Sequence, residues 1–144
     1  MKKVIYILFL LFPILFFSCE IETSGNGKLD GNWQLLFVDT LSTGGVCDMK
    51  QSSIYWGVEK NLLQVRNTEN GEKIFFRFEK NENVLIIHSP HVFESKYETV
   101  PVEDESRLVP FGIQGLEDVF QIEKLTNSNF VLVNQQLRLH FRKY

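Results

Sequence analysis

From Gly31 onward, apolar residues recur at every second position, and short turn motifs interrupt the pattern at regular intervals. Alternation with period two places alternate side chains on the two faces of a β-strand. The segments with this pattern are 33–37, 54–58, 62–66, 74–78, 84–88, 120–125, 130–133 and 137–142, with a weaker candidate at 96–102. No helical stretch is long enough to support the crossovers of a parallel sheet. The sequence therefore predicts an all-β fold, a single antiparallel up-and-down meander of eight or nine strands that closes into a barrel and so has no free edge.

Turn motifs and one irregular stretch divide this pattern. Asn70-Gly71 is the clearest hairpin motif, because both residues tolerate the positive φ of a type I′ turn. The stretch 103–118 does not alternate, begins with charged residues and contains Pro110 and two glycines. Such a stretch predicts a loop, and we expect one helical turn near 116–119.

The first 18 residues have the features of an export signal. Lys2 and Lys3 precede an apolar run, 4–17, which is shorter than the ~20 residues of a membrane-spanning helix. The run ends in Ser18-Cys19, and a small residue before Cys at this place resembles the lipobox of bacterial lipoproteins. That resemblance implies cleavage before Cys19 and attachment there of a diacylglycerol and an N-acyl chain such as palmitate, a stable membrane anchor. Ordinary secretion with a free Cys19 is the alternative.

The lipobox resemblance also divides the chain into parts. It implies a signal peptide (1–18), a lipid-anchored polar linker (19–28) and a folded domain (29–144). We expect a lipid-anchored protein of the cell envelope, in the outer membrane, with its periplasmic or surface face left open. Cys47 is then the one unmodified thiol, and we expect it to be buried, with an intermolecular disulfide as the alternative.

Composition limits the classes of function. A chain of 144 residues predicts one domain, and its 44% of hydrophobic residues excludes a disordered chain. The 15 Lys and Arg against 18 Asp and Glu give a net charge of −3, so a strongly basic nucleic-acid binder is also excluded. The sequence contains no nucleophile elbow, phosphate-binding Gly-rich loop or His-Glu-x-x-His motif. We therefore expect neither an enzyme nor a cofactor.

The histidines and one acidic run were the remaining candidates for chemistry. His88 and His91 flank Ser-Pro and could contribute to a metal site or, as a weaker alternative, to a hydrolase. No third ligand has matching spacing, so we expect a polar loop after a strand and no metal. Glu103-Asp104-Glu105 lacks the spaced oxygen ligands and the Gly turn of a calcium loop, and a solvated loop is the simpler interpretation.

Residues Gly31-Asn32-Trp33, on the first expected strand, resemble the Gly-x-Trp motif of lipocalins. Lys28-Leu29-Asp30 and the C-terminal segment 139–144 also resemble the small lipocalin-like domains of bacterial lipoproteins. The resemblance covers about residues 28–144 in strand order and implies a lipocalin-like barrel. A barrel of eight strands is just wide enough to be filled by side chains or to hold one small ligand.

In lipocalins the Trp of this motif closes one end of the barrel and packs under an arginine of the last strand. The resemblance thus implies that Gly31 and Trp33 are structural residues and that Arg142 is this arginine, with Arg138 as the second match. A cation over an indole ring contributes about 1–2 kcal/mol when it is desolvated.

The many aromatic residues leave two hypotheses open. The first is a membrane-anchored lipocalin-like protein that binds a small apolar or amphipathic ligand in the barrel, with Trp33, Trp56, Phe76 and Phe78 as the candidate wall. The second is a filled barrel that acts through its loops, above all 100–118, as an accessory to an envelope complex or as an inhibitor. Asp39-Thr40-Leu41 also matches a short O-glycosylation pattern, but we expect it to be an ordinary strand end.

Overall fold

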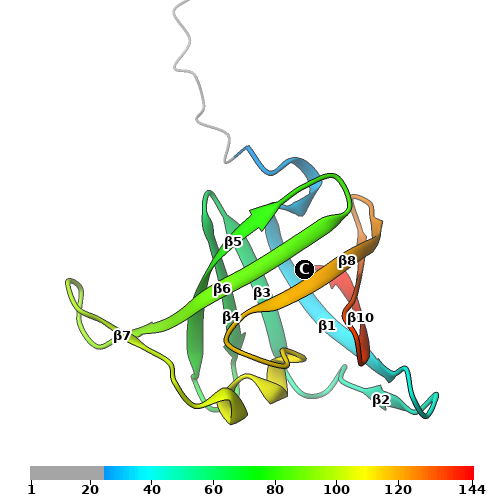
Figure 1. Ribbon diagram of the computed structural model, residues 1–144, viewed down its shortest axis with the longest axis horizontal. Helices are drawn as coiled ribbons and strands as arrows, with labels where there is room; N and C mark the ends of the chain where they lie inside the picture. Colours follow the sequence, from blue (N-terminus) through cyan, green and yellow to red (C-terminus); the bar gives the residue numbers. More distant parts are fainter. Residues whose placement is uncertain (1–24) are drawn as a thin grey trace, which may run out of the picture.

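Ten strands follow one another along residues 25–144, the part of the chain that the computed structural model describes (Figure 1). The strands are β1 (Gly31–Thr40), β2 (Val46–Asp48), β3 (Ile54–Glu59), β4 (Leu62–Asn67), β5 (Lys73–Lys80), β6 (Val84–Phe93), β7 (Thr99–Pro101), β8 (Asp118–Leu125), β9 (Asn129–Val133) and β10 (Leu137–Lys143). Three 3₁₀-helices accompany them, namely η2 (Gly27–Leu29), η3 (Glu105–Arg107) and η4 (Val109–Phe111). Residues 25–144 contain no helix with the length and apolar character needed to cross a bilayer.

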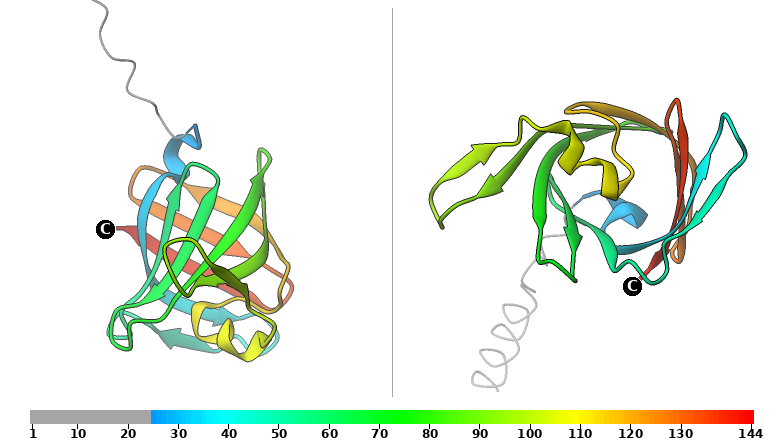
Figure 2. Two further views of the ribbon diagram at one scale, coloured as in Figure 1. Left: turned by 90° about the vertical axis from the view of Figure 1, so that its left-hand side faces the viewer. Right: turned by 90° about the horizontal axis from the view of Figure 1, so that it is seen from below.

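Eight of the strands form a closed antiparallel barrel. Their order is β1, β3, β4, β5, β6, β8, β9, β10, and β10 pairs back onto β1 with Trp33 opposite Lys143 and Thr40 opposite Leu137. Among the described strands, β2 pairs with β1 alone and β7 with β6 alone, so both lie beside the ring as hairpin extensions (Figure 2). The predicted all-β class and closed antiparallel barrel are therefore confirmed.

Strand β3 shows how the alternating sequence builds the barrel. Ile54, Trp56 and Val58 are buried, whereas Tyr55 and Gly57 between them face outward. Burial of each large apolar side chain contributes about 1.5–3 kcal/mol, which fixes the register because a slip by one residue would expose the whole set. The inward sets of the eight strands meet in a single hydrophobic cluster inside the ring.

Two segments outside the strands close the ends of the barrel. At one end lies η2, where Leu29 is buried and its carbonyl accepts a hydrogen bond from Trp33 Nε1 at 2.9 Å. Seen from below in Figure 2, η3 and η4 lie across the opposite end, where Phe111 is buried and its carbonyl accepts from Trp56 Nε1 at 3.2 Å. We call residues 105–113 the plug.

Glycine is required where the plug ends. Gly112 has a φ of +82°, and a Cβ at this position would lie 2.7 Å from Leu139 Cδ2. A side chain here would be strained by the backbone and would also clash with the core. Because Gly112 has no side chain, η4 can pack closely against Leu139 in the core.

The turn predicted at Asn70-Gly71 differs in type. A hairpin does connect β4 and β5, but only Gly71 has a positive φ (+76°), and the loop spans Asn67–Glu72. The side chains of Asn67 and Asn70 each accept a backbone hydrogen bond, from Glu69 N and Glu72 N at 2.9 Å. These Asx turns stabilise a longer loop, so the type I′ prediction is wrong.

Two other local predictions are also wrong. The expected polar loop at His88–His91 is part of β6, which continues to Phe93 through a bulge where Ser89 has a φ of +55°. A bulge adds one residue to a strand, so the period-two alternation that predicts a strand is interrupted at that point. The helical turns lie in η3 and η4 rather than near 116–119, where β8 already begins. The hairpin strand β2 was not predicted at all.

Several predictions concern residues outside the described part of the chain. These are the signal peptide, the lipobox, cleavage before Cys19 and its lipidation, and most of the linker, because the structure describes residues 25–144. They are unaffected by what the described residues show.

Candidate functional site

The barrel interior is occupied by the chain's own aromatic rings. Trp33, Trp56 and Phe76 are fully buried, and Phe78 packs half-buried against the same cluster. Three inward rings of β8, β9 and β10 lie against the two tryptophans, with centroid separations of 5.1–5.8 Å. The pairs are Trp33–Phe130, Trp56–Phe120 and Trp56–Phe141. The two tryptophans predicted to form part of a ligand wall therefore pack against other aromatic rings of the core.

The cation at the closed end is Lys143 rather than Arg142. Lys143 Nζ lies 4.3 Å from the centre of the Trp33 ring and donates to the carbonyl of Asp30. Arg142 is exposed on the other face of β10, where its Nε donates to Gln34 Oε1 at 3.0 Å. The prediction for Arg142 is wrong. Side chains alternate between the two faces of β10, and Lys143 is the register partner of Trp33. Lys143 therefore shares the inward face of Trp33, whereas Arg142 points to the other face.

This correction predicts unequal effects of two neighbouring substitutions. Lys143→Met is expected to lower the free energy of unfolding by about 1–2 kcal/mol, because it removes a cation–π contact and a hydrogen bond at the barrel end. Arg142→Met is expected to change it by less than about 0.5 kcal/mol, because it alters an exposed side chain. Urea denaturation of both variants measures the difference. A larger loss in Arg142→Met would contradict the placement.

The outer surface carries an uninterrupted row of opposed residues. Residues directly opposite each other in antiparallel strands lie on the same face and contact one another. Following the register from β1 to β7 gives Asn32, Gly57, Gln64, Phe75, His91 and Pro101, one residue from each of β1, β3, β4, β5, β6 and β7. We call these six residues the outer row.

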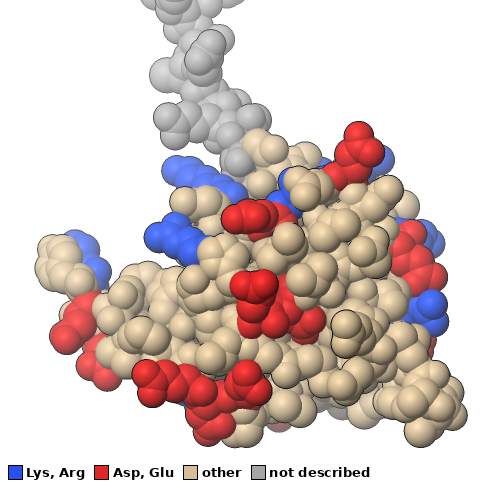
Figure 3. Space-filling view, in the orientation of Figure 1, with Lys and Arg blue, Asp and Glu red and all other residues tan. Residues whose placement is uncertain are grey.

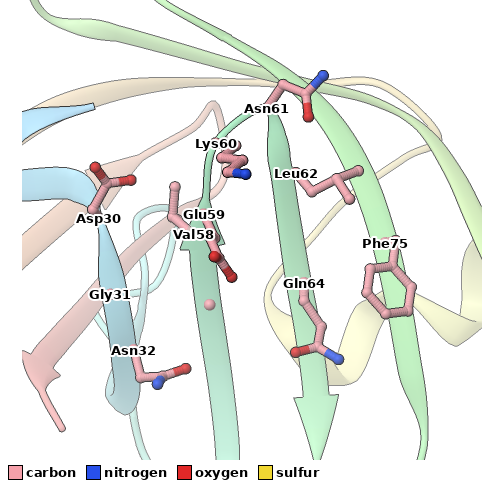
Figure 4. A pocket seen from close by; sticks show the side chains of 11 residues that line it. Asp30, Gly31, Asn32, Val58, Glu59, Lys60, Asn61, Leu62, Gln64 and Phe75 are labelled. Atoms are coloured by element: carbon pink, nitrogen blue, oxygen red, sulfur yellow. The ribbon is translucent and has the colours of Figure 1, made fainter. Parts of the chain in front are cut away.

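A hollow of about 520 Å³ lies over the first part of the outer row, and we call it the outer groove. Figure 4 shows the side chains of Asn32, Gln64 and Phe75 coming from different strands of the barrel wall. Its volume falls within the ~300–1,000 Å³ of small-molecule sites. The lining comprises Asp30, Gly31, Asn32, Gly57, Val58, Glu59, Lys60, Asn61, Leu62, Gln64 and Phe75.

Gly57 leaves the floor of the outer groove without a side chain. A Cβ here would lie 3.1 Å from Asn32 Oδ1 and 3.9 Å from Gln64 Oε1. The backbone of Gly57 is outside the left-handed region, so its conformation does not require glycine. Glycine inside a strand costs about 0.5–1 kcal/mol and often marks close approach of a ligand or another backbone. Gly57 is therefore the functional candidate that residue-type motifs could not reveal.

A second hollow, of about 380 Å³, adjoins the outer groove and shares Leu62 with it. His91 and Phe93 line it, and both rings contact Phe75, with centroid separations of 6.0 and 4.7 Å. Phe93 is 47% exposed. An aromatic surface thus continues the outer row beyond Phe75.

The two histidines of β6 make local contacts. His88 Nδ1 lies 2.8 Å from Ser89 Oγ, and His91 Nδ1 lies 2.9 Å from the Ser89 carbonyl. His88 Nε2 is 4.0 Å from Glu79 Oε1. Within residues 25–144, no group of three His, Cys, Asp or Glu side chains is placed to hold a metal ion. His88 and His91 therefore belong to the bulged strand β6, and His91 also belongs to its aromatic surface.

A buried carboxylate connects the loop before β8 to the β9–β10 turn. Asp118 Oδ2 accepts from Gln114 N at 2.9 Å and from Asn134 Nδ2 at 3.0 Å. Burial raises the pKa of the Asp118 carboxyl above its ordinary 3.8, although these hydrogen bonds favour the charged form. A hollow of about 280 Å³ lies beside it. These two hydrogen bonds join the loop before β8 to the β9–β10 turn, which indicates a structural role.

The raised pKa of Asp118 predicts a pH-dependent effect of Asp118→Asn. Between pH 3.8 and the raised pKa, the folded wild type binds more protons than the unfolded chain. The stabilising contribution of the protonated Asp118 carboxyl is therefore complete below pH 3.8 and is lost as the pH rises through the raised pKa. Asparagine does not titrate. The free energy of unfolding of the variant relative to wild type is therefore expected to increase from pH 3 to pH 7, as measured by urea denaturation. Glu117→Gln controls for the loss of one charge, and a falling difference would contradict the prediction.

Cys47 and the acidic run lie on the surface. Cys47 is a free, exposed cysteine in β2, so the expectation of burial is wrong, because this hairpin lies beside the barrel and not over its core. Glu103, Asp104 and Glu105 are exposed, and Asp104 caps η3 by accepting from Ser106 N at 3.0 Å. Figure 3 shows one group of acidic side chains at the end away from the grey N-terminal segment and others elsewhere on the same face.

Comparisons with known proteins agree with this architecture. The model of the lipocalin-like domain family matches residues 14–144. A lipocalin-like protein from Bacteroides uniformis superposes with a TM-score of 0.64 at 20% identity, covering 82% of this chain and all of that one. An uncharacterized protein from Bacteroides eggerthii gives 0.61 at 20% identity, covering 81% and 99% of the two chains. No curated protein matches significantly. At this identity the two structures share the fold alone, whereas the family match shows that the chain belongs to the lipocalin-like domain family.

Proposed function

We propose that this lipocalin-like protein is a non-catalytic binding protein of the cell envelope that uses its filled barrel as a scaffold and binds on its outer face. The lipocalin-like fold supports a role in ligand binding. The single observation that supports a site outside the barrel is that its interior is filled: Trp33, Trp56 and Phe76 are fully buried, and both indole rings pack against other rings of the barrel. The outer groove, by contrast, is an open hollow lined by polar side chains and one aromatic ring, Phe75.

The envelope location is part of the proposal and depends on Cys19. We expect incorporation of an alkyne-labelled palmitate into the full chain in an exporting bacterium, and recovery of the chain with membranes. Cys19→Ala removes the lipid attachment point, so both signals are expected to be lost. Cys47→Ala is the matched control and should retain both. Labelling that persists in Cys19→Ala would contradict the anchor.

Site-specific photo-crosslinking tests the outer face. Benzoylphenylalanine is placed at position 64, in the outer groove, or at position 121, an exposed glutamine of β8 away from it. After irradiation of cells, a reproducible covalent adduct is expected at position 64 and not at 121. Equal adducts at both positions would contradict the proposal. Adducts at neither, together with an apolar adduct on the wild type in native mass spectrometry, would also contradict it.

One observation keeps a ligand inside the barrel as the second candidate. The plug that covers one end consists of short 3₁₀-helices outside the strand pairing, and the carbonyl of its Phe111 accepts a hydrogen bond from Trp56. Displacing it would uncover the predicted wall of Trp33, Trp56, Phe76 and Phe78. A partner that engages the loop 100–118 could act in the same place, because Val109 within it is 59% exposed.

A further inference from the structure

We propose that the outer groove binds a neutral oligosaccharide lying across the strands. This inference rests on the proposed function and names the ligand class for the same face. It draws on four features of the described residues: unengaged amides, an apolar wall, balanced charge and an elongated shape.

The polar side of the outer groove presents amides. Within residues 25–144, no hydrogen bond engages the side chain of Gln64, and Asn32 uses only its Oδ1, which accepts from Arg66 Nη1 at 3.1 Å. This bond holds Asn32 with its Nδ2 available to donate. Each amide offers a donor and an acceptor, and a sugar hydroxyl can satisfy both roles. The pair therefore suits a ligand rich in hydroxyl groups.

The outer groove is apolar beside Gln64. Phe75 and Leu62 line it, and Phe75 is held in place by ring contacts with His91 and Phe93. Sugar rings carry faces of C–H groups, which pack on the electron-rich face of an aromatic ring. Amides that lie beside an aromatic ring match the two chemistries of a carbohydrate.

The charges around the outer groove favour a neutral ligand. Asp30 and Glu59 contribute carboxylates and Lys60 an ammonium group to the lining. The guanidinium of Arg66 lies beside Asn32 and over the Tyr55 ring, 5.1 Å from its centre. With both signs present and neither in clear excess, an anion or a cation would gain little net attraction.

The shape favours a chain over a compact molecule. The outer groove adjoins the second hollow at Leu62, and the outer row continues under both. A ligand that follows the row would cross β1, β3, β4, β5 and β6. Gly57 lets such a chain approach the backbone, because no side chain rises from the floor there.

The test uses the full chain, purified in a detergent without a sugar headgroup. Cellohexaose, xylohexaose, mannohexaose and maltohexaose are the probes, and a chondroitin sulfate hexasaccharide is the charged control. Binding is measured by calorimetry and by amide chemical shifts. We expect at least one neutral probe to bind and to shift the amides of Gly57 and Gln64, with no binding of the charged control.

Two glycine variants make the test specific. Gly57→Thr fills the floor and is expected to weaken the neutral probe about tenfold or more. Gly45→Thr is the matched control: its added Cβ would meet one side-chain atom at 3.2 Å, its φ is ordinary, and it lies in the β1–β2 loop. It should bind as the wild type does. Thermal denaturation of both variants confirms folding, and Phe75→Leu replaces Gly57→Thr if the latter fails to fold.

Three outcomes overturn the inference: no neutral probe binds, the charged control binds as well as the neutral ones, or Gly57→Thr binds as the wild type does. The crosslinking experiment separates this failure from failure of the proposed function. A specific adduct at position 64 together with no sugar binding would retain the outer-face site and reject the oligosaccharide.

Discussion

The Trp56→Ala variant is expected to lose about 3–5 kcal/mol of unfolding free energy, the range for truncation of a large buried aromatic side chain. Trp56 is fully buried, its ring lies against Phe120 and Phe141, and its Nε1 donates to the Phe111 carbonyl. Removal of the indole leaves a cavity between these rings and an unpaired carbonyl at the plug. Urea denaturation followed by circular dichroism measures the loss.

Two further variants make this result interpretable. Trp56→Phe retains much of the apolar volume and removes the hydrogen bond, so its loss should be smaller. Tyr97→Ala alters a side chain that is 89% exposed, and its effect should stay within about 0.5 kcal/mol. A loss below about 1 kcal/mol in Trp56→Ala would show that Trp56 borders open space in solution, in favour of a ligand inside the barrel.

Phe111→Ala is expected to destabilise the barrel by about 3–5 kcal/mol and to create a binding cavity beneath η4. Phe111 is 1% exposed and belongs to the same core cluster as Trp56. Dry cavities lined by apolar side chains bind small apolar molecules such as benzene or xenon. Xenon-induced shifts of amide and methyl resonances, compared between variant and wild type, measure the gain.

Val109→Ala is the control for this prediction, because Val109 lies in the same 3₁₀-helix but is 59% exposed. It should neither bind xenon nor change stability by more than about 0.5 kcal/mol. Wild-type shifts as large as those of Phe111→Ala would show that the plug already opens in solution. Since Trp56 and Phe111 are hydrogen-bonded, the two alanine substitutions are not expected to be additive.

Most of the barrel strands were predictable because their residues alternate between apolar and polar. In β3 and β10, the inward residues Trp56 and Leu139 are flanked by residues that tolerate solvent, and this pattern fixes the face as well as the strand. The alternation breaks at two places in the chain. The bulge at Ser89 and the plug that contains Pro110 follow local backbone geometry, which period-two patterning does not encode.

The site was less predictable, for two physical reasons. Whether Trp33 and Phe76 line a cavity or fill it depends on how closely the rings pack, and composition does not give that distance. The outer groove depends on register: Asn32, Gly57 and Gln64 lie side by side although they belong to three different strands. Their shared outward position could have been inferred from the alternation, but the alignment of neighbouring strands could not.

The outer row constrains how the sequence of such a protein can diverge in evolution. Asn32 adjoins Trp33 and Gly57 adjoins Trp56, so these outer-row residues each lie one position from a core residue on their own strand. Point substitutions can therefore vary the outer surface without disturbing the packed interior. Insertion or deletion of one residue within a strand would exchange the two faces and disrupt the outer row and the core together. Related chains should accordingly diversify this surface by substitution while keeping strand lengths fixed.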